Sequence, residues 1–480
     1  MPTCSSTDPS TQGSARGEKR NRPGMGRWRW LTAWLALGGS GVLGVLLNSP
    51  LTVGLRPFDR YLAFGVPAAV AAATLAAMGR GTAGRRTGAH LVLLLAVATV
   101  VGLACSRESL LEDRRRRVHR APFEQAWAVG RHVIAGFTDL DDIAALAAKG
   151  AVGGVYITQR NIAGKSAGRI AAEIRSLQAV RKRAGLPPLI VCADQEGGAV
   201  SRLSPPLTRL RALGDLLPAS GSAAELEAAV SLYAETQARG LAALGINVNL
   251  GPVVDLRPAF APAANSDRTQ LAKRAISSDP GEVVAVALPY CRILEHSGII
   301  PTLKHFPGLG RVRQDTHLQL GELTTRPSIL SSRDWLPFEN ILSQTGAFMM
   351  VGHVRMAAVD PDHPASLSRA VVQGVIRDRW GHDGILMTDD LNMAPAYAVR
   401  GGIGAAAVCA LNAGIDLVLV SYDSRQYYTV MTALLKALKN GSLDRCRLSV
   451  SDRRLARVAT FLRVPRSKKS DMVAGITHGG

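Results

Sequence analysis

The hydrophobic pattern of the chain changes near residue 120. Before this point, apolar residues form long runs without a polar face, whereas after it short apolar runs alternate with Ala- and Leu-rich helical stretches. Such alternation is typical of repeated βα units, whose strands form a parallel sheet. The pattern therefore predicts apolar helices first and an α/β domain after them.

Eight strands are predicted in the second part of the chain, at residues 133–137, 152–158, 189–193, 246–250, 300–303, 348–352, 385–388 and 417–421. Runs such as 348–351 are apolar at every position, as a strand needs when it is buried on both faces. Eight βα units are the number that closes a (β/α)8 TIM-type barrel. We therefore expect a barrel over residues 121–465.

The first part of the chain contains three apolar runs, at residues 28–47, 61–78 and 90–105. Each is near the lower end of the ~17 to 25 residues that cross a bilayer. Arginines occupy the connectors, which favours transmembrane helices in contact with membrane lipid over core helices of a soluble domain. A second interpretation of the third run is a lipoprotein signal that ends at Cys105.

Charge supports the membrane interpretation. Residues 1–120 hold 17 Lys or Arg against 6 Asp or Glu, so they carry +11 of the total +20. A basic flank around apolar runs suits anionic lipid better than nucleic acid, for which the chain has no recognition motif. We expect a disordered basic tail at residues 1–27, a basic linker at 106–120 and a disordered tail at 466–480.

Three crossings would place the barrel outside the cytoplasm, in a multi-pass membrane protein. The loop with Arg80, Arg85 and Arg86 agrees with this topology, because positive loops stay inside. The arginines at 114–117 and Arg120 argue against it, since they directly follow the third run.

Length, hydrophobic content and cysteine spacing are consistent with this predicted architecture. The 480 residues accommodate one barrel with additions, and their 47% hydrophobic content fits the membrane segments. The six cysteines are far apart and form no CxxC or Cys/His cluster, so we expect neither a metal site, nor a cofactor, nor a disulfide framework.

Polar residues follow five of the predicted strands. They are Asp194, Asp255, Lys304 with His305, His353, and Asp389 with Asp390. In a TIM barrel the carboxyl ends of all strands meet at one mouth, where active sites lie. These side chains are therefore expected to converge.

The strings around these residues resemble the peptidoglycan-recycling β-N-acetylglucosaminidases of glycoside hydrolase family 3. The likeness runs over about 340 residues and rests on 194-DQEGG-198, 304-KHFPGLG-310 followed by 315-DTH-317, 364-PASLS-368 and 388-TDDLNM-393. It implies a retaining enzyme that removes terminal N-acetylglucosamine from peptidoglycan fragments through a covalent glycosyl-enzyme.

By this resemblance, Asp389 is the nucleophile. A carboxylate in this role must be ionised, and cationic partners such as Lys304 would lower its pKa. Asp390 is the better candidate for a cap on the following helix.

The resemblance also implies an unusual acid/base, the pair Asp315 and His317. An imidazole can protonate the leaving oxygen and later accept a proton from water, while the aspartate orients it. We expect an extended loop whose two-residue spacing places both side chains on one side.

The substrate-binding residues implied by the resemblance are Asp194, Arg274, Lys304 and His305, with Arg268 as a weaker rival of Arg274. Leu309 stands where many relatives carry a histidine, which we interpret as a variant of the loop.

Two other functions remain open. A histidine acid/base does not repel phosphate as a carboxylate would, so a β-N-acetylglucosaminide phosphorylase is an alternative. A membrane-bound sensor that binds muropeptides without turnover is another, although Asp389, Asp315 and His317 together argue for catalysis.

Overall fold

The computed structural model describes residues 24–47, 55, 58–79, 87–217, 221–259, 269–397 and 399–464. The chain divides into two compact units, residues 1–108 and 109–480. The expected tail at 466–480 lies outside the described residues, as do residues 1–23 of the expected tail at 1–27.

The first unit is helical in its described part. It contains α1 (Gly24–Leu46), the π-helical turn η2 (Tyr61–Gly65), α2 (Val66–Gly79) and the first half of α3 (Thr87–Arg120). Its buried apolar side chains form two small clusters, one around Leu37 and Leu93 and one around Ala63. Many large apolar side chains on these helices are exposed, among them Leu35 and Leu95.

Two helices of this unit are long and apolar enough to cross a membrane, Tyr61–Met78 and Gly88–Arg120. The apolar part of α1, Leu31–Leu46, is shorter. Two of the three expected spans therefore meet this criterion, and membrane insertion stays a prediction.

Helices occupy two regions near the expected boundaries. The expected linker at 106–120 forms the last turns of α3, and α1 begins inside the expected tail. Arg, Glu and Leu are good helix formers, so the basic cluster does not interrupt α3. Its end is fixed to the barrel unit, because Val118 is fully buried and Arg115 pairs with Asp142 at 2.9 Å.

Eight parallel strands in the described part of the chain close into a barrel in the order β1-β12-β11-β9-β7-β6-β3-β2. The strands are β1 (Val133–Gly136), β2 (Gly154–Tyr156), β3 (Ile190–Ala193), β6 (Val248–Asn249), β7 (Ile300–Phe306), β9 (Phe348–Val351), β11 (Leu386–Asp390) and β12 (Leu417–Val420). Each overlaps its predicted range, and the predicted barrel is confirmed.

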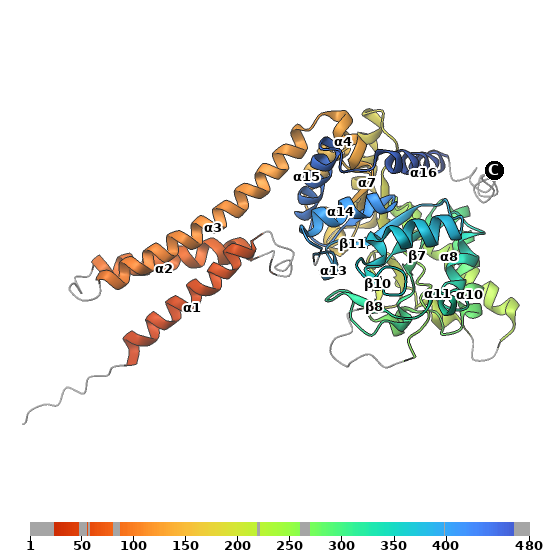
Figure 1. The fold of residues 1–480 in the computed structure, drawn as a ribbon, viewed down its shortest axis with the longest axis horizontal. Helices are drawn as coiled ribbons and strands as arrows, with labels where there is room; N and C mark the ends of the chain where they lie inside the picture. The colour runs from red at the N-terminus through yellow and green to blue at the C-terminus, as the bar shows by residue number, and fades with distance from the viewer. Residues whose placement is uncertain are drawn as a thin grey trace, which may run out of the picture. The chain divides into compact units, whose positions relative to one another are not determined.

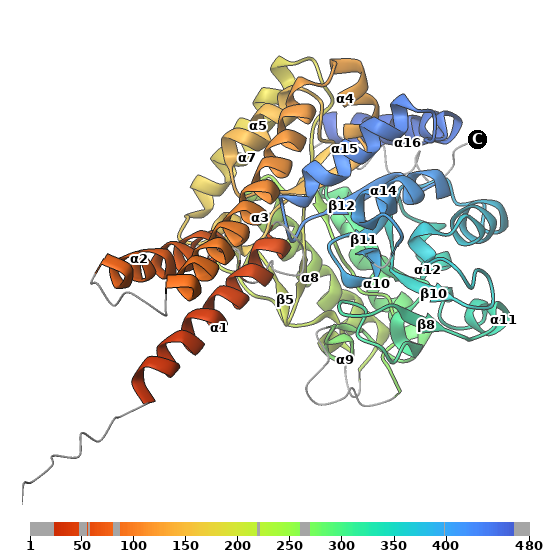
Figure 2. The same cartoon turned by 60° about the vertical axis from the view of Figure 1, so that its left-hand side comes forward.

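Helices surround the barrel, and α14 and α15 lie side by side on its outside (Figures 1 and 2). The longer ones are α4 (Phe123–Gly130), α5 (Leu140–Ala148), α7 (Ala167–Arg183), α8 (Ala223–Leu244), α10 (Pro280–His296), α12 (Leu336–Leu342), the π-helix η6 (Ala370–Arg379), α14 (Gly402–Ala413), α15 (Gln426–Lys439) and α16 (Arg445–Arg463). Polar caps start several of them: Asp279, for example, accepts the backbone N–H of Glu282 at 3.0 Å.

Shorter elements lie in the loops. They are α6 (Gln159–Ile162), α9 (Leu271–Arg274), α11 (Pro327–Ser331), α13 (Ala394–Tyr397), the 3-10 turns η3 (Leu213–Leu216), η4 (Leu309–Arg311) and η5 (Ala365–Leu367), and the two-stranded pairs β4 (Gln195–Gly197) with β5 (Val200–Ser201) and β8 (Gly321–Leu323) with β10 (Val354–Met356).

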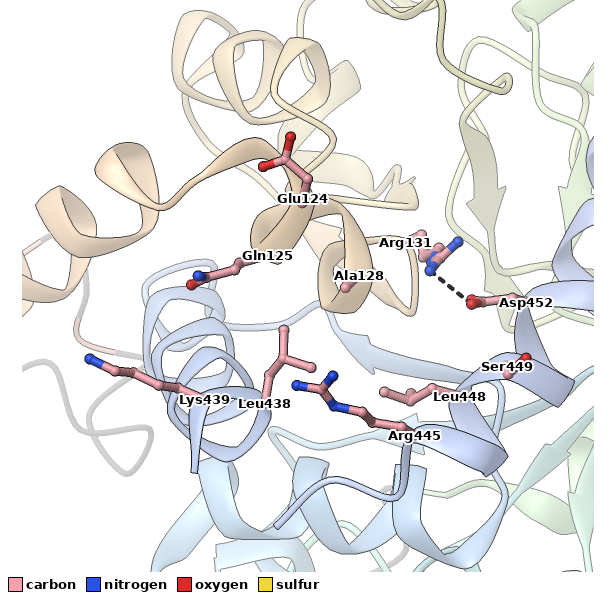
Figure 3. Close-up of a pocket in the computed structure, with 10 residues that line it drawn as sticks. All are labelled: Glu124, Gln125, Ala128, Arg131, Leu438, Lys439, Arg445, Leu448, Ser449 and Asp452. Atoms are coloured by element: carbon pink, nitrogen blue, oxygen red, sulfur yellow. Dashed lines mark ion pairs between the residues drawn. The ribbon is translucent and has the colours of Figure 1, made fainter. Parts of the chain in front are cut away.

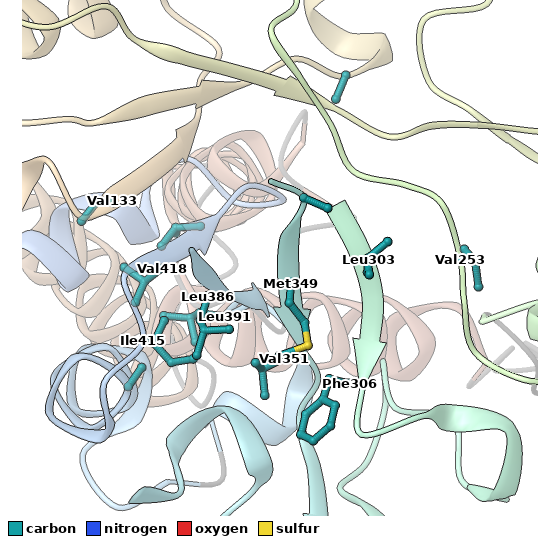
Figure 4. Packing of buried hydrophobic residues seen from close by; sticks show 14 of the residues in the cluster. Val133, Val253, Leu303, Phe306, Met349, Val351, Leu386, Leu391, Ile415 and Val418 are labelled. Atoms are coloured by element: carbon teal, nitrogen blue, oxygen red, sulfur yellow. The ribbon is translucent and has the colours of Figure 1, made fainter. Parts of the chain in front are cut away.

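Alternate residues of each strand face two cores. Outward-facing residues such as Met349 and Val351 of β9 pack in the large cluster beneath the helices (Figure 4). Inward-facing residues such as Ile134 and Leu417 fill the barrel interior, where Phe461 of α16 joins them. Alternation on two apolar faces is why the strands appear in the sequence as continuous apolar runs.

Candidate active site

Asp389 lies at the carboxyl end of β11, where the strand pairs with both β9 and β12. Its Oδ1 accepts the backbone N–H of Asp390 at 2.8 Å. Burial alone would raise the pKa of this carboxyl, but electrostatic interactions with His305, His353 and His317 outweigh it and lower the pKa. Asp389 is therefore held as a carboxylate among three imidazoles.

The neighbouring Asp390 has a different role. Its Oδ2 accepts hydrogen bonds from the Ser421 hydroxyl at 2.6 Å and from the Tyr422 backbone at 2.9 Å, and its Oδ1 accepts the Asn392 backbone N–H at 3.0 Å. Burial raises its pKa despite these bonds. Asp390 thus braces β11 against the loop after β12, and the expected helix is reduced to the short α13.

Asp315 and His317 lie in the loop between β7 and β8. Asp315 Oδ1 is 3.3 Å from His317 Nδ1 and accepts the His317 backbone N–H at 3.0 Å. The expected extended loop is wrong: this backbone bond closes a turn that brings the two side chains together. The His317 side chain is 42% exposed, so a leaving group can reach its ring.

The His317 loop is tied to the Asp389 loop. The backbone N–H of Ala394 donates to the His317 carbonyl at 3.2 Å. The two proposed catalytic groups therefore belong to loops that contact each other, although they are 72 residues apart.

Lys304 lies at the centre of a buried ionic cluster. Its Nζ is 2.6 Å from both Asp194 Oδ1 and Glu196 Oε1. Arg274 donates from Nε and Nη2 to the two Glu196 oxygens, each at 2.8 Å, while Tyr156 donates to Asp194 at 2.7 Å. Two cations beside Glu196 lower its pKa to about 2 against the opposing effect of burial.

This cluster corrects the expected role of Lys304. The lysine pairs with Asp194 and Glu196, whereas the side chains that lower the pKa of Asp389 are histidines. Burial opposes its charge, but the two carboxylates raise the pKa of Lys304. Lys304 therefore remains a cation that is paired with the carboxylates of the loop after β3.

His305 and His353 face the site with fixed orientations. His305 Nδ1 donates to Asp255 at 2.7 Å, and the same carboxylate accepts the His305 backbone N–H at 3.0 Å. His353 Nε2 donates to the Asp390 carbonyl at 3.2 Å, while Ser366 donates to its Nδ1 at 2.7 Å. Burial lowers the pKa of His353, which fits this neutral tautomer.

The predicted site residues thus come together at one mouth, in two groups. Three residues that received no role from the sequence join them: Glu196, Asp255 and His353. Each lies in a motif or at a strand end that the sequence analysis identified. The sequence indicated these positions, but it did not indicate which side chains they would contact. The weaker candidate Arg268 lies outside the described residues.

The residues described by the structure contain no group of His, Cys, Asp or Glu side chains arranged to hold a metal ion. Cysteines 105, 192, 291, 409 and 446 are free thiols.

A separate hollow of about 350 Å³ opens at the opposite end of the barrel. It lies between α4, α15 and α16, with the ion pair between Arg131 and Asp452 at its side (Figure 3). Because Arg131 precedes β1 and Lys439 ends α15, this hollow faces away from the strand ends that carry the candidate site.

Residues 125–458 match the N-terminal domain of glycosyl hydrolase family 3. The beta-hexosaminidase LpqI of Mycobacterium tuberculosis is 34% identical over 282 residues, which are 57% of this chain and 68% of that protein. A beta-hexosaminidase of Xylella fastidiosa is 34% identical over 278 residues, 57% of this chain and 77% of the relative.

Solved structures of family 3 enzymes are also similar to this chain. A family 3 beta-N-acetylglucosaminidase from Paenibacillus superposes with a TM-score of 0.61 at 28% identity, over 73% of this chain and 67% of that one. LpqI of Mycobacterium tuberculosis superposes with a TM-score of 0.57 at 30% identity, over 71% of this chain and 94% of that one.

Proposed function

The chain belongs to glycoside hydrolase family 3, with relatives named beta-hexosaminidase, and from this premise we propose a retaining β-N-acetylglucosaminidase that acts on peptidoglycan fragments. The observation that carries the proposal is Asp389. It is a carboxylate at a rigid strand end, with its pKa lowered by three imidazoles, as a glycosidase nucleophile requires.

In the first step, Asp389 attacks the anomeric carbon and the bond from that carbon to the leaving oxygen breaks. The imidazolium of His317 gives its proton to the leaving oxygen. In the second step, His317 takes a proton from water, whose oxygen attacks the anomeric carbon and releases Asp389. Asp315, 3.3 Å away, orients the ring and stabilises its charged form.

The ionic cluster across the mouth suits the hydroxyl groups of the sugar in this proposal. Asp194 can accept hydroxyl donors, while Lys304 and Arg274 can donate to hydroxyl oxygens. Glu196 holds both cations in place, and Asp255 holds His305. The hydroxyl groups of the sugar that is attacked would therefore lie over β3 and β7.

We further propose that the N-terminal helices tether the enzyme to the membrane, with the barrel outside the cytoplasm. Support comes from the apolar Tyr61–Met78 and Gly88–Arg120 helices and from their exposed apolar side chains.

Purified protein tests the proposed activity directly. We expect p-nitrophenyl β-N-acetylglucosaminide to be cleaved much faster than the glucoside, with the β-anomer as the first product by NMR. Comparable rates would contradict the acetamido specificity, and a first product of α configuration would contradict retention. A sugar phosphate formed when phosphate is added would identify the phosphorylase instead.

A further inference from the structure

An aromatic side chain and a guanidinium form a bridge at the rim of the barrel mouth. Tyr422, two residues beyond the end of β12, is 54% exposed. Arg160 of α6, which follows β2, lies with its Cζ 5.3 Å from the centre of the Tyr422 ring. The bridge spans the end of β1, because β1 lies between β12 and β2 in the barrel.

The bridge is held at both ends. Arg160 Nη2 donates to the Tyr422 carbonyl at 2.5 Å, and the Tyr422 backbone N–H donates to Asp390 Oδ2 at 2.9 Å. Beneath it, Asn161 of α6 donates to the Phe137 carbonyl at the end of β1, at 2.9 Å. The Tyr422 backbone is therefore tied to Asp390, the residue next to the proposed nucleophile, and its ring lies with one face towards Arg160.

The barrel order gives the direction of the substrate. Asp194 follows β3 and Asp389 is the last residue but one of β11, and these strands are four places apart in a ring of eight, on opposite sides of the mouth. A sugar held by its hydroxyls at Asp194, with its anomeric carbon at Asp389, has the bond to its leaving group on the β11 side of the mouth. That rim has the His317 loop on one side and Tyr422, after the adjacent β12, on the other.

We propose that Tyr422 and Arg160 bind the leaving sugar: the Tyr422 ring packs on it, and Arg160 pairs with the carboxylate that the N-acetylmuramic acid of a peptidoglycan fragment carries. The C–H face of a pyranose packs on the open face of an aromatic ring. Arg160 is exposed, and its hydrogen bond to the Tyr422 carbonyl uses Nη2, so its other guanidinium N–H groups can pair with a carboxylate. The inference rests on the proposed function and assigns the two residues that recognise its acidic second sugar.

Three substrates separate this subsite from the sugar site itself. They are N-acetylglucosaminyl-β-1,4-N-acetylmuramic acid, chitobiose, whose second sugar is neutral, and N-acetylglucosaminyl β-fluoride, whose leaving group fills no subsite. We expect Tyr422→Ala to lower kcat/KM on both disaccharides about tenfold more than on the fluoride. Arg160→Gln should lower it on the acidic disaccharide alone by about ten- to a hundredfold relative to chitobiose.

The outcomes are distinct. Equal losses on all three substrates would overturn the inference, because they would mean that the bridge only braces Asp390. Equal losses of Arg160→Gln on the two disaccharides would overturn the carboxylate contact. Tyr422→Phe keeps the ring and should retain the wild-type ratio, and the exposed Leu232→Ala on α8 serves as a surface control. Wild-type protein inactive on the fluoride would instead contradict the proposed function.

Discussion

Asp389 and Asp390 are adjacent in sequence but lie in opposite electrostatic surroundings. Three imidazoles lower the pKa of Asp389, whereas burial raises that of Asp390, whose partners are hydroxyl, amide and backbone groups. The difference follows from strand geometry, since successive residues point to opposite sides. The Asp389 carboxylate can therefore act as the proposed nucleophile, while Asp390 connects β11 to the loop after β12.

Replacement of the nucleophile gives a direct test at this scale. We expect Asp389→Ala to lower kcat on aryl N-acetylglucosaminides by roughly a thousandfold or more, because no other group at the strand end can form the glycosyl-enzyme. Added azide should restore turnover and yield the α-glycosyl azide, which NMR identifies. The exposed Asp362→Ala is the control, and Asp389→Ala activity within about tenfold of it would reject the assignment.

The acid role of His317 predicts a dependence on the leaving group. We expect His317→Ala to slow cleavage of disaccharides by about a hundredfold more than that of activated aryl glycosides, which leave without protonation. The matched control is His363→Ala, since His363 also lies 3.3 Å from an aspartate, Asp360, but in an exposed loop. Equal losses on both substrate classes would exclude His317 as the acid.

At the scale of elements, the barrel could be predicted because each strand carries its own signal. A run that is apolar at every position, such as 348–351, predicts a strand that is buried on both faces. The eight runs together predict a closed barrel. The end of α3 could not be predicted, because its position depends on Val118 and Arg115 contacting the barrel unit. The partners of Lys304 could not be predicted either, because Asp194 and Glu196 are more than a hundred residues away in the sequence.

Helix α10 contains a buried carboxyl that should make stability depend on pH. Glu295 is 3% exposed, and burial raises its pKa to about 8. The folded chain keeps this proton at a pH where the unfolded chain, with an ordinary glutamate, has lost it. The free energy of unfolding should therefore be highest below about pH 4.5 for this group and fall as pH rises towards 8.

Glu295→Gln should remove this dependence. Relative to the variant, wild type is expected to lose up to about 1.4 kcal/mol per pH unit between pH 5 and 8, measured by urea unfolding. The exposed Glu227→Gln on α8 should follow wild type. Parallel curves for wild type and Glu295→Gln would show that Glu295 ionises normally.

At the scale of the whole molecule, the number of spans decides where the enzyme works. With the N-terminus inside, three crossings export the barrel and two retain it. We expect protease added to intact spheroplasts to digest the barrel, with a cytoplasmic marker protein as the control. A barrel protected until lysis would contradict the external location and would fit recycling of imported fragments.

Helix α16 has a consequence for biosynthesis. Phe461 lies about forty residues after the end of β12 and packs in the barrel interior with inward-facing residues such as Ile134 of β1 and Leu417 of β12. During translation all eight strands therefore leave the ribosome before the side chain that covers their inner core. Until then, the apolar inner face of the strands of the nascent chain is exposed to water. We expect chaperones that bind apolar segments to act in this interval.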